Sequence, residues 1–269
     1  MLDLSALSGL PMQLDDAGQL HFEPDVEIEE TRVRLLEELE PVALDPASCQ
    51  ANRAAAYYMW NGVRRREDAG RLAGLPLRYE LTLLPPLRLG RECAKTFGHI
   101  HNAEPHSGRT YPEICEVLTG VAHFLFQTLD PRGPSADCAL CVEVRAGQKL
   151  IFPSGLDHLT INAGTEPVLF SDVVALASRG LYDRFRATRG ACYLLVDDGA
   201  GPHYVANPTY RAVPPLERLQ ARDYPEIALT TGRPLYTAFV QGRGEGWRFL
   251  TEPDCIELDL HSLQAAFKD

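Results

Sequence analysis

Two histidines separated by one residue, His99 and His101, are the side chains whose spacing first points to chemistry. Residues two apart on a β-strand face the same side of a sheet, so two imidazoles placed in this way can reach one ion. Taken alone, the pair is equally compatible with two unrelated surface histidines. The residues further along the chain favour the metal site.

A third histidine, His158, lies in a pattern of turn-forming residues: Gly147, Pro153 and Gly155 precede it, and Asn162 follows it. Glycine and proline make tight turns, which would bring the strand of His158 back over the strand of His99. Asn162 can anchor the loop beyond. The sequence therefore predicts a metal-binding site between returning strands.

The elements that must position these residues are short β-rich runs separated by Pro and Gly, which begin at Leu77. This spacing predicts a β-sandwich or barrel rather than alternating strands and helices. Upstream, the apolar spacing in Glu29–Leu39 predicts an amphipathic helix, and a second helix is expected from about Ser48 to Arg66. After the barrel, Ala191–Val196 is expected to be a strand and Leu260–Phe267 a short helix.

The composition is that of a globular protein, with 269 residues, 45% hydrophobic and 23% charged. The formal net charge of -11 argues against nucleic acid as a partner. No apolar run reaches the roughly 18 residues of a membrane span, and the start lacks the basic region of a signal peptide, so we expect no membrane association and a cytoplasmic location. The 7 cysteines are expected to be reduced thiols, and the single C-x-x-C pair, Cys138 and Cys141, is expected in a surface turn.

The two histidine-containing blocks resemble the paired motifs of the cupin superfamily, whose small β-barrel holds a divalent metal between three histidines and one glutamate. This resemblance implies His99, His101, Glu113 and His158 as the metal ligands. Neutral imidazoles and one carboxylate suit one divalent transition metal per subunit, Fe, Mn, Ni or Zn. The interval before Glu113 is longer than the general cupin spacing, and its extra residues are expected to form a loop over the barrel mouth.

The runs KTFGHIH and SGRTYPEICEVLTGVAHFLFQ closely resemble the cupin-type glucose-6-phosphate isomerases of archaea and bacteria. The resemblance implies a metal-dependent aldose–ketose isomerase of glycolysis and gluconeogenesis that interconverts glucose 6-phosphate and fructose 6-phosphate. Glu113 and His158 are the implied catalytic residues. Proton transfer by Glu113 and a metal-assisted hydride shift both remain open.

Two departures from the family leave the sugar open. Cys115 stands where the family usually carries a tyrosine, and the stretch VVALASRGLYD contains Tyr182 but no histidine. Two other functions are therefore considered: another metal-dependent cupin enzyme, either an iron dioxygenase or an isomerase of a different sugar, and a non-catalytic sugar-binding cupin.

The resemblance also implies a sugar-phosphate pocket that contains Thr82, Thr96 and the backbone of Gly98, with Lys95 close enough in sequence to supply positive charge. Strand alternation puts Thr96 and the first histidine on opposite faces unless a bulge lies between them. For Gln127, a place in the substrate pocket and a place in a buried polar pair are both open.

We therefore expect an all-β dominated fold, a cupin barrel of the double-stranded β-helix or jelly-roll type, in residues 77–178. An N-terminal arm and helices would occupy residues 1–76, and an irregular C-terminal extension in 179–269 would pack on the barrel. A phosphorylated sugar is the expected partner, and a homodimer is expected because cupins commonly form one.

Overall fold

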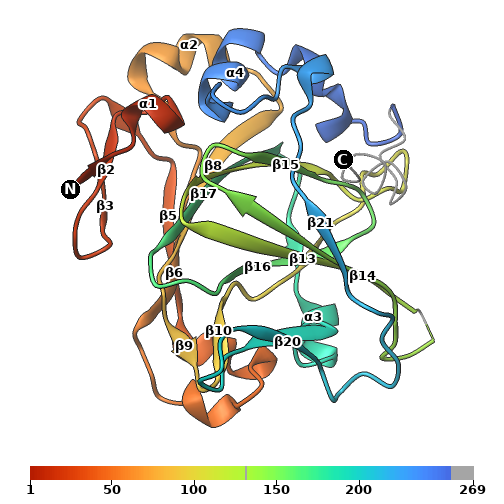
Figure 1. Cartoon of the computed structure of the whole chain (residues 1–269). Coiled ribbons are helices and arrows are strands. Elements are labelled where there is room, and N and C mark those ends of the chain that lie inside the picture. The colour runs from red at the N-terminus through yellow and green to blue at the C-terminus, as the bar shows by residue number, and fades with distance from the viewer. Residues whose placement is uncertain (131, 256–269) are drawn as a thin grey trace.

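Two antiparallel sheets that share one core form the centre of the molecule in the computed structural model, which describes residues 1–130 and 132–255 (Figure 1). One sheet has the neighbours β15 (Lys149–Phe152), β12 (Glu113–Thr119), β17 (Val168–Ala175) and β8 (Leu77–Leu84). The other has the neighbours β10 (Glu92–Lys95), β16 (Asp157–Asn162), β13 (Val121–Leu129) and β14 (Ala136–Arg145). Counted along the chain, these eight strands have the spatial orders 6-3-8-1 and 2-7-4-5. This interleaving is that of a jelly roll, so the predicted cupin barrel is confirmed.

Aromatic side chains fill the space between the two sheets. The Phe124 ring of β13 lies 5.0 Å from the Phe152 ring of β15 and 5.7 Å from the Phe170 ring of β17, measured between ring centroids. Edge-to-face contacts of this kind stabilise a core beyond the area that they bury. Every residue of β12, β15, β16 and β17 is buried, which shows that other parts of the chain also cover the outer faces of the barrel.

Flanking segments extend both sheets. The strands β6 (Ala55–Asn61) and β5 (Glu30–Leu35) continue the first sheet beyond β8. The second sheet gains β9 (Arg88–Leu89), β19 (Tyr193–Val196), β20 (His203–Ala206) and β21 (Glu217–Gln220). The strand expected within Ala191–Val196 is thereby confirmed as β19.

The predicted N-terminal helices are wrong. Glu29–Leu39 contains β5 and then a 3-10 helix, η1 (Leu36–Val42), and Ser48–Arg66 contains β6. The reason is tertiary pairing, because β6 lies between β5 and β8 and its aromatic residues suit a half-buried sheet. The start of the expected N-terminal arm forms a small sheet of β1 (Leu2–Asp3), β2 (Met12–Leu14) and β3 (Leu20–Phe22).

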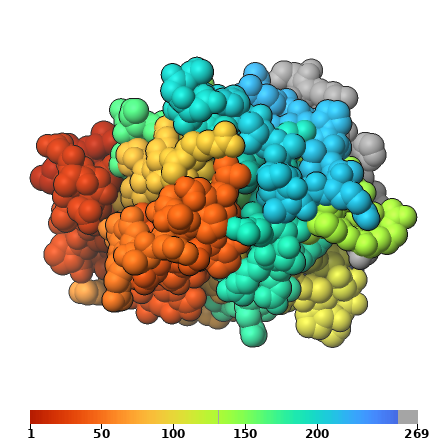
Figure 2. Space-filling view, turned by 90° about the horizontal axis from the view of Figure 1, so that it is seen from below, coloured from red at the N-terminus to blue at the C-terminus, as the bar shows by residue number. Residues whose placement is uncertain are grey.

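Short elements surround the barrel. Helices α1 (Ser5–Ser8), α2 (Ala69–Leu72) and α4 (Leu235–Gly242) gather at the top in Figure 1, and α3 (Asp183–Ala187) lies at the bottom. The remaining elements are β4 (Val26–Glu27), β7 (Arg64–Arg65), β11 (Ile100–His101), β18 (Gly180–Leu181), η2 (Pro46–Ser48), η3 (Arg66–Asp68), η4 (Pro225–Ile227) and η5 (Glu245–Leu250). Seen from below, the orange N-terminal segment and the teal segment around α3 lie side by side (Figure 2), and α3 contacts η1.

Three smaller expectations concern single segments. Cys138 and Cys141 lie within strand β14, so the predicted surface turn is wrong. The helix expected at Leu260–Phe267 falls outside the described residues. Within residues 1–130 and 132–255, no helix is both long and apolar enough to span a membrane.

Candidate metal centre

Three histidines meet inside the barrel. One nitrogen of each of His99, His101 and His158 lies within 4.8 Å of the others, so the three could hold a metal ion together. The backbone fixes two of them directly, because His99 N–H donates to the His158 carbonyl at 3.0 Å and His158 N–H donates to the His99 carbonyl at 2.9 Å. The returning strand expected from the turn residues is therefore present.

Backbone carbonyls orient two of the rings. The Nδ1 atom of His101 lies 2.8 Å from the Tyr111 carbonyl oxygen, and the Nδ1 atom of His158 lies 3.3 Å from the Leu156 carbonyl oxygen. A ring that donates from Nδ1 presents an unprotonated Nε2, which is the form that binds a metal. The Nε2 of His158 is buried and makes no hydrogen bond among the described residues. Since an unpaired buried nitrogen is costly, the donor set fits a bound cation.

Burial keeps these imidazoles neutral. Loss of hydration lowers the pKa of His101 to about 4 and the pKa of His158 to about 3, and it places the pKa of His99 well below its ordinary value. Neighbouring imidazoles add to the lowering for His99 and His158. At neutral pH a metal ion would therefore displace no proton from the three rings.

Glu113 lies beside this cluster, on the inner face of β12. One carboxylate oxygen is 3.5 Å from the His101 Nε2 and 4.0 Å from the His158 Nε2. Burial raises the pKa of Glu113 to about 8, the negative charge of Glu80 adds to this effect, and Arg78 opposes it. Three nitrogen donors and a neighbouring carboxylate are a donor set that divalent transition metals accept.

Sequence reasoning missed two further acidic residues on the same inner face. Asp172 on β17 is the cross-strand partner of both Cys115 and Glu80. Burial raises the pKa of Asp172 well above its ordinary value, and the charges of Glu113 and Glu80 add to the effect. Only the strand register reveals this grouping, because the three acids are far apart in sequence.

A β-bulge brings Thr96 and His99 to the same side. Thr96 N–H donates to the Thr160 carbonyl at 2.9 Å, and His99 pairs with His158, so Phe97 and Gly98 together oppose the single residue Leu159. The extra residue reverses the strand alternation, which is the exception that the sequence analysis required. The Thr96 hydroxyl accepts a hydrogen bond from Thr160 N–H at 3.0 Å.

The bulge requires a φ of +84° at position 98, which glycine adopts without strain. A Cβ atom at this position would lie 2.5 Å from the Phe185 ring. Thr82 also lies on the inner side of its sheet, where it pairs with Phe170 of β17 and Met59 of β6. Thr82 and Thr96 thus both face the interior of the barrel, and Gly98 lies in the bulge next to His99.

Two residues considered for the substrate pocket point away from the histidines: the expectation for Lys95 needs correction, and for Gln127 the structure shows the alternative, a place in a buried polar pair. Lys95 is 2% exposed, and its ammonium group donates to the Val42 carbonyl at 2.6 Å and to Glu92. Gln127 donates to the Tyr210 hydroxyl at 2.9 Å and accepts from Cys192 N–H at 2.7 Å. In both cases strand alternation decides the face, because Lys95 pairs with Ile161 and Gln127 pairs with Asp157, on the side of the sheet opposite to His158.

The long interval before Glu113 forms a loop that contacts the centre. Glu104 accepts hydrogen bonds from the backbone of His106 at 3.0 Å and of Ser107 at 2.7 Å, and Tyr111 supplies the carbonyl that orients His101. Arg109 donates to the Pro253 carbonyl at 3.4 Å. The loop therefore connects a candidate metal ligand to the C-terminal segment.

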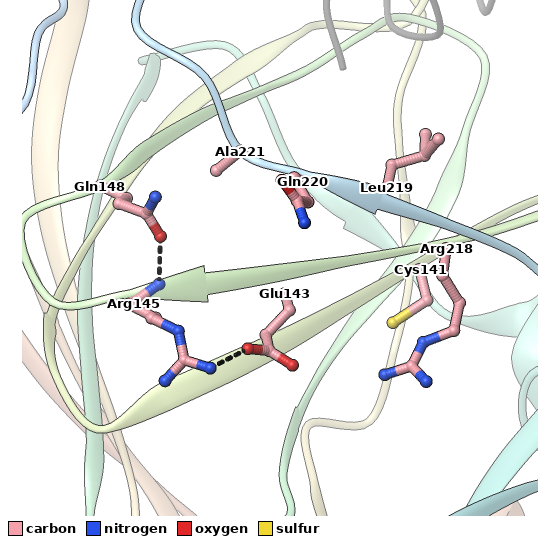
Figure 3. Close-up of a pocket in the computed structure, with 8 residues that line it drawn as sticks. All are labelled: Cys141, Glu143, Arg145, Gln148, Arg218, Leu219, Gln220 and Ala221. Atoms are coloured by element: carbon pink, nitrogen blue, oxygen red, sulfur yellow. Dashed lines mark hydrogen bonds and ion pairs between the residues drawn. The ribbon is translucent and has the colours of Figure 1, made fainter. Parts of the chain in front are cut away.

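A separate polar pocket of about 410 Å³ lies between β14 and β21 (Figure 3). Its lining includes Glu143 and Arg145, which form an ion pair, and Arg218 beside Cys141. These β14 residues lie on the face of the sheet opposite to the one that carries His158. The pocket is thus distinct from the metal centre.

Comparisons with known proteins identify a family. The family model of glucose-6-phosphate isomerase (GPI) matches residues 33–210. No curated protein matches the chain. Among solved structures, oxalate oxidase in complex with glycolate is 20% identical with a TM-score of 0.28, and the match covers 37% of this chain and 41% of that one. A variant of oxalate decarboxylase from B. subtilis is 18% identical with a TM-score of 0.31, and the match covers 47% of this chain and 28% of that one.

The chain spans less than half the length of either solved structure. The cupin fold therefore rests on the strand order described above.

Proposed function

Because this chain belongs to the glucose-6-phosphate isomerase family, we propose that it interconverts glucose 6-phosphate and fructose 6-phosphate in a metal-dependent reaction. The observation that supports this proposal best is the trio His99, His101 and His158, with a buried, unpartnered Nε2 on His158. Together with Glu113, these residues would hold one divalent metal ion, of which Fe, Mn, Ni and Zn are the candidates.

A bound divalent ion would act as a Lewis acid on the carbonyl oxygen and the neighbouring hydroxyl of the sugar. The protein has to supply a group that moves a proton between adjacent carbons. Glu113 suits this task, because its carboxylate lies on the inner face of β12 beside the histidines, 3.5 Å from the His101 Nε2. In this proposal, the Glu113 carboxylate accepts the proton from C2 of glucose 6-phosphate and returns it to C1, while the hydroxyl proton on O2 moves to O1.

Other residues shape the environment of the reaction. The Phe152 ring lies 5.0 Å from the His158 ring, and the Phe126 ring lies 6.2 Å from it, measured between centroids. These apolar rings exclude water from one side of the centre, which strengthens electrostatic interactions inside it. The Tyr111 carbonyl holds His101 in its metal-binding tautomer.

The test is a coupled assay on chelator-treated protein, before and after addition of each of the four metals. We expect conversion of fructose 6-phosphate to glucose 6-phosphate only with metal, and loss of activity in His158→Ala but not in His203→Ala, which removes a half-exposed histidine of β20. Other phosphorylated sugars are tested in parallel, because Cys115 replaces the tyrosine usual in the family. Oxygen consumption without isomerisation would overturn the proposal in favour of an iron dioxygenase.

The role of Glu113 as a base is tested by a variant that cannot accept a proton at this position. Glu113→Gln at full metal occupancy is expected to lose most of its turnover. Unchanged turnover would exclude Glu113 as the base and favour a hydride shift between the two carbons.

The cytoplasmic location, the homodimer and the division into residues 1–76, 77–178 and 179–269 stay predictions. Size-exclusion chromatography with light scattering would test the homodimer directly.

A further inference from the structure

A phosphorylated sugar carries two negative charges into a chain whose formal net charge is -11, so a local cation has to offset the repulsion. Lys95 does not meet this requirement, because it is buried and paired with Glu92 on the outer side of the sheet. Another cation is therefore needed near Thr96 and Gly98.

Arg34 on β5 occupies such a position. It pairs across the sheet with Tyr57, whose hydroxyl accepts a hydrogen bond from Phe97 N–H at 3.3 Å. The Arg34 guanidinium carbon lies 5.7 Å from the ring centroids of both Phe97 and Tyr182. Cation–π contacts with two rings hold the guanidinium in place before any ligand arrives.

The guanidinium of Arg34 has an N–H donor that makes no hydrogen bond among the described residues. Its Nη1 donates to Glu38 at 2.9 Å, whereas its Nε is buried and has no partner among the described residues. A second cation, Arg186 of α3, lies 5.4 Å from the same Phe97 ring. The Nη1 of Arg186 donates to Asp183 at 3.2 Å, so each of the two guanidinium groups already has one carboxylate partner and keeps further N–H groups for an anion such as phosphate.

One aromatic side chain contacts both Arg34 and the metal centre. The ring centroid of Tyr182 lies 5.6 Å from the His99 ring and 5.7 Å from the Arg34 guanidinium carbon. A hexose phosphate whose C1 and C2 oxygens lie at the histidines would extend its C6 phosphate past Tyr182. The segment that contains Thr96 and Gly98 connects the two sites, because the Phe97 ring contacts Arg34 and His99 belongs to the metal centre.

We propose that Arg34, with Arg186 at the same Phe97 ring as a second cation, binds the phosphate group of the sugar and thereby sets the preference for phosphorylated substrates. This inference rests on the proposed function for the identity of the sugar. The two arginines would bind any anion that resembles a phosphate group, whatever the sugar. Arginine suits the role because its planar fork matches phosphate oxygens.

The test compares Arg34→Met, Arg34→Lys and Arg32→Met in the metal-loaded full chain. Arg32 lies two residues away on β5, is 62% exposed at its side chain, and forms an ion pair with Glu30, so it controls for the change in net charge. We expect Arg34→Met to raise KM for fructose 6-phosphate by about tenfold or more, with a smaller change in kcat. The selectivity for fructose 6-phosphate over fructose should fall with it, Arg34→Lys should recover part of the loss, and Arg32→Met should match the wild type.

Binding of inorganic phosphate, measured by calorimetry, separates this inference from the isomerase proposal. Wild-type protein that binds phosphate and an Arg34→Met variant that does not would support the phosphate site even if no sugar is turned over. Equal phosphate affinity in both proteins, or an equal loss in Arg32→Met, would overturn the inference. Thermal unfolding of each variant, monitored by circular dichroism, shows whether it is folded.

Discussion

At the scale of single residues, the centre combines donors of two kinds. The histidines are held neutral by burial, whereas burial of Glu113 favours its protonated form, with a pKa of about 8. A metal ion therefore finds His99, His101 and His158 ready to bind, but it has to displace a proton from Glu113. This difference allows the role of the glutamate to be measured without any substrate.

Metal affinity is expected to depend on pH in a way that reports on Glu113. If the carboxylate binds the ion, affinity should fall by about tenfold for each unit of pH below about 8, because one proton competes for the same oxygen. His101 and His158, with pKa values of about 4 and 3, add no proton release near neutral pH. Calorimetry at about pH 6.5 and pH 7.5, in buffers of different ionisation enthalpy, counts the released protons.

The matched control is Glu113→Gln, which should bind metal more weakly at high pH and lose the pH dependence. Equal affinity of the wild type at both pH values would show that Glu113 does not coordinate the ion as a carboxylate.

At the scale of elements, one bulge decides which side chains share the barrel interior. By inserting one residue opposite Leu159, it turns Thr96 toward the side of His99 and leaves Lys95 on the outer side. Gly98 permits the bulge through its positive φ and its missing side chain. The geometry of His99 therefore depends on the glycine that precedes it.

Gly98→Ala tests this dependence. The new Cβ would meet the Phe185 ring at 2.5 Å, and an L-residue at a φ of +84° is strained, so the free energy of unfolding should fall by about 2 kcal/mol or more. Metal affinity should fall with it as His99 moves. Denaturant unfolding and metal titration measure the two effects.

Gly155→Ala is the matched comparison. Gly155 also has a positive φ, +87°, but no atom lies within 4 Å of the point that a Cβ would occupy, so its loss of stability should be smaller. If Gly98→Ala bound metal as tightly as the wild type, the bulge would not be what positions His99.

The sequence predicted the barrel well because turn residues and β-rich runs alternate clearly after Leu77. It failed in the N-terminal segment, where Val33, Leu35 and Leu36 match helical spacing but belong to a strand followed by a 3-10 helix. A helix in this segment does not predict that Arg34 pairs with Tyr57 of β6. Local spacing cannot reveal that β5 and β6 are stabilised by pairing with the barrel.

The site was predictable to the extent that it follows strand alternation. The three histidines lie together, whereas Lys95 and Gln127 face outward, as alternation from Ala94 and Phe126 requires. The sheet register therefore excludes the side chains of Lys95 and Gln127 from a substrate pocket beside the histidines.

At the scale of the whole molecule, the C-terminal segment covers an apolar outer face of the barrel. Leu81, Ile114 and Leu118 are at most 1% exposed and share a core cluster with Leu235 and Phe239 of α4. The buried pair of Lys149 and Glu116 fixes this cover, since Lys149 donates to the Thr230 carbonyl at 3.0 Å and Glu116 accepts from Leu235 N–H at 2.6 Å.

A chain that ends at residue 222 should therefore expose this face and aggregate. Removal of α4 returns large aliphatic side chains to water and leaves a buried ion pair without two of its hydrogen bonds. Solubility and binding of a hydrophobic dye compare the shortened and full chains. A shortened chain that stays monomeric, with an unchanged unfolding midpoint, would show that the C-terminal segment does not stabilise the barrel.

The rate of fructose 6-phosphate isomerisation as a function of bound metal per subunit decides whether the protein is a metal-dependent isomerase. We expect a rate proportional to metal occupancy, close to zero in the chelated protein, and no activity in His158→Ala, which removes a proposed ligand atom, the buried Nε2 of His158. A rate independent of occupancy, or a fully loaded protein that isomerises no phosphorylated sugar, would contradict this expectation.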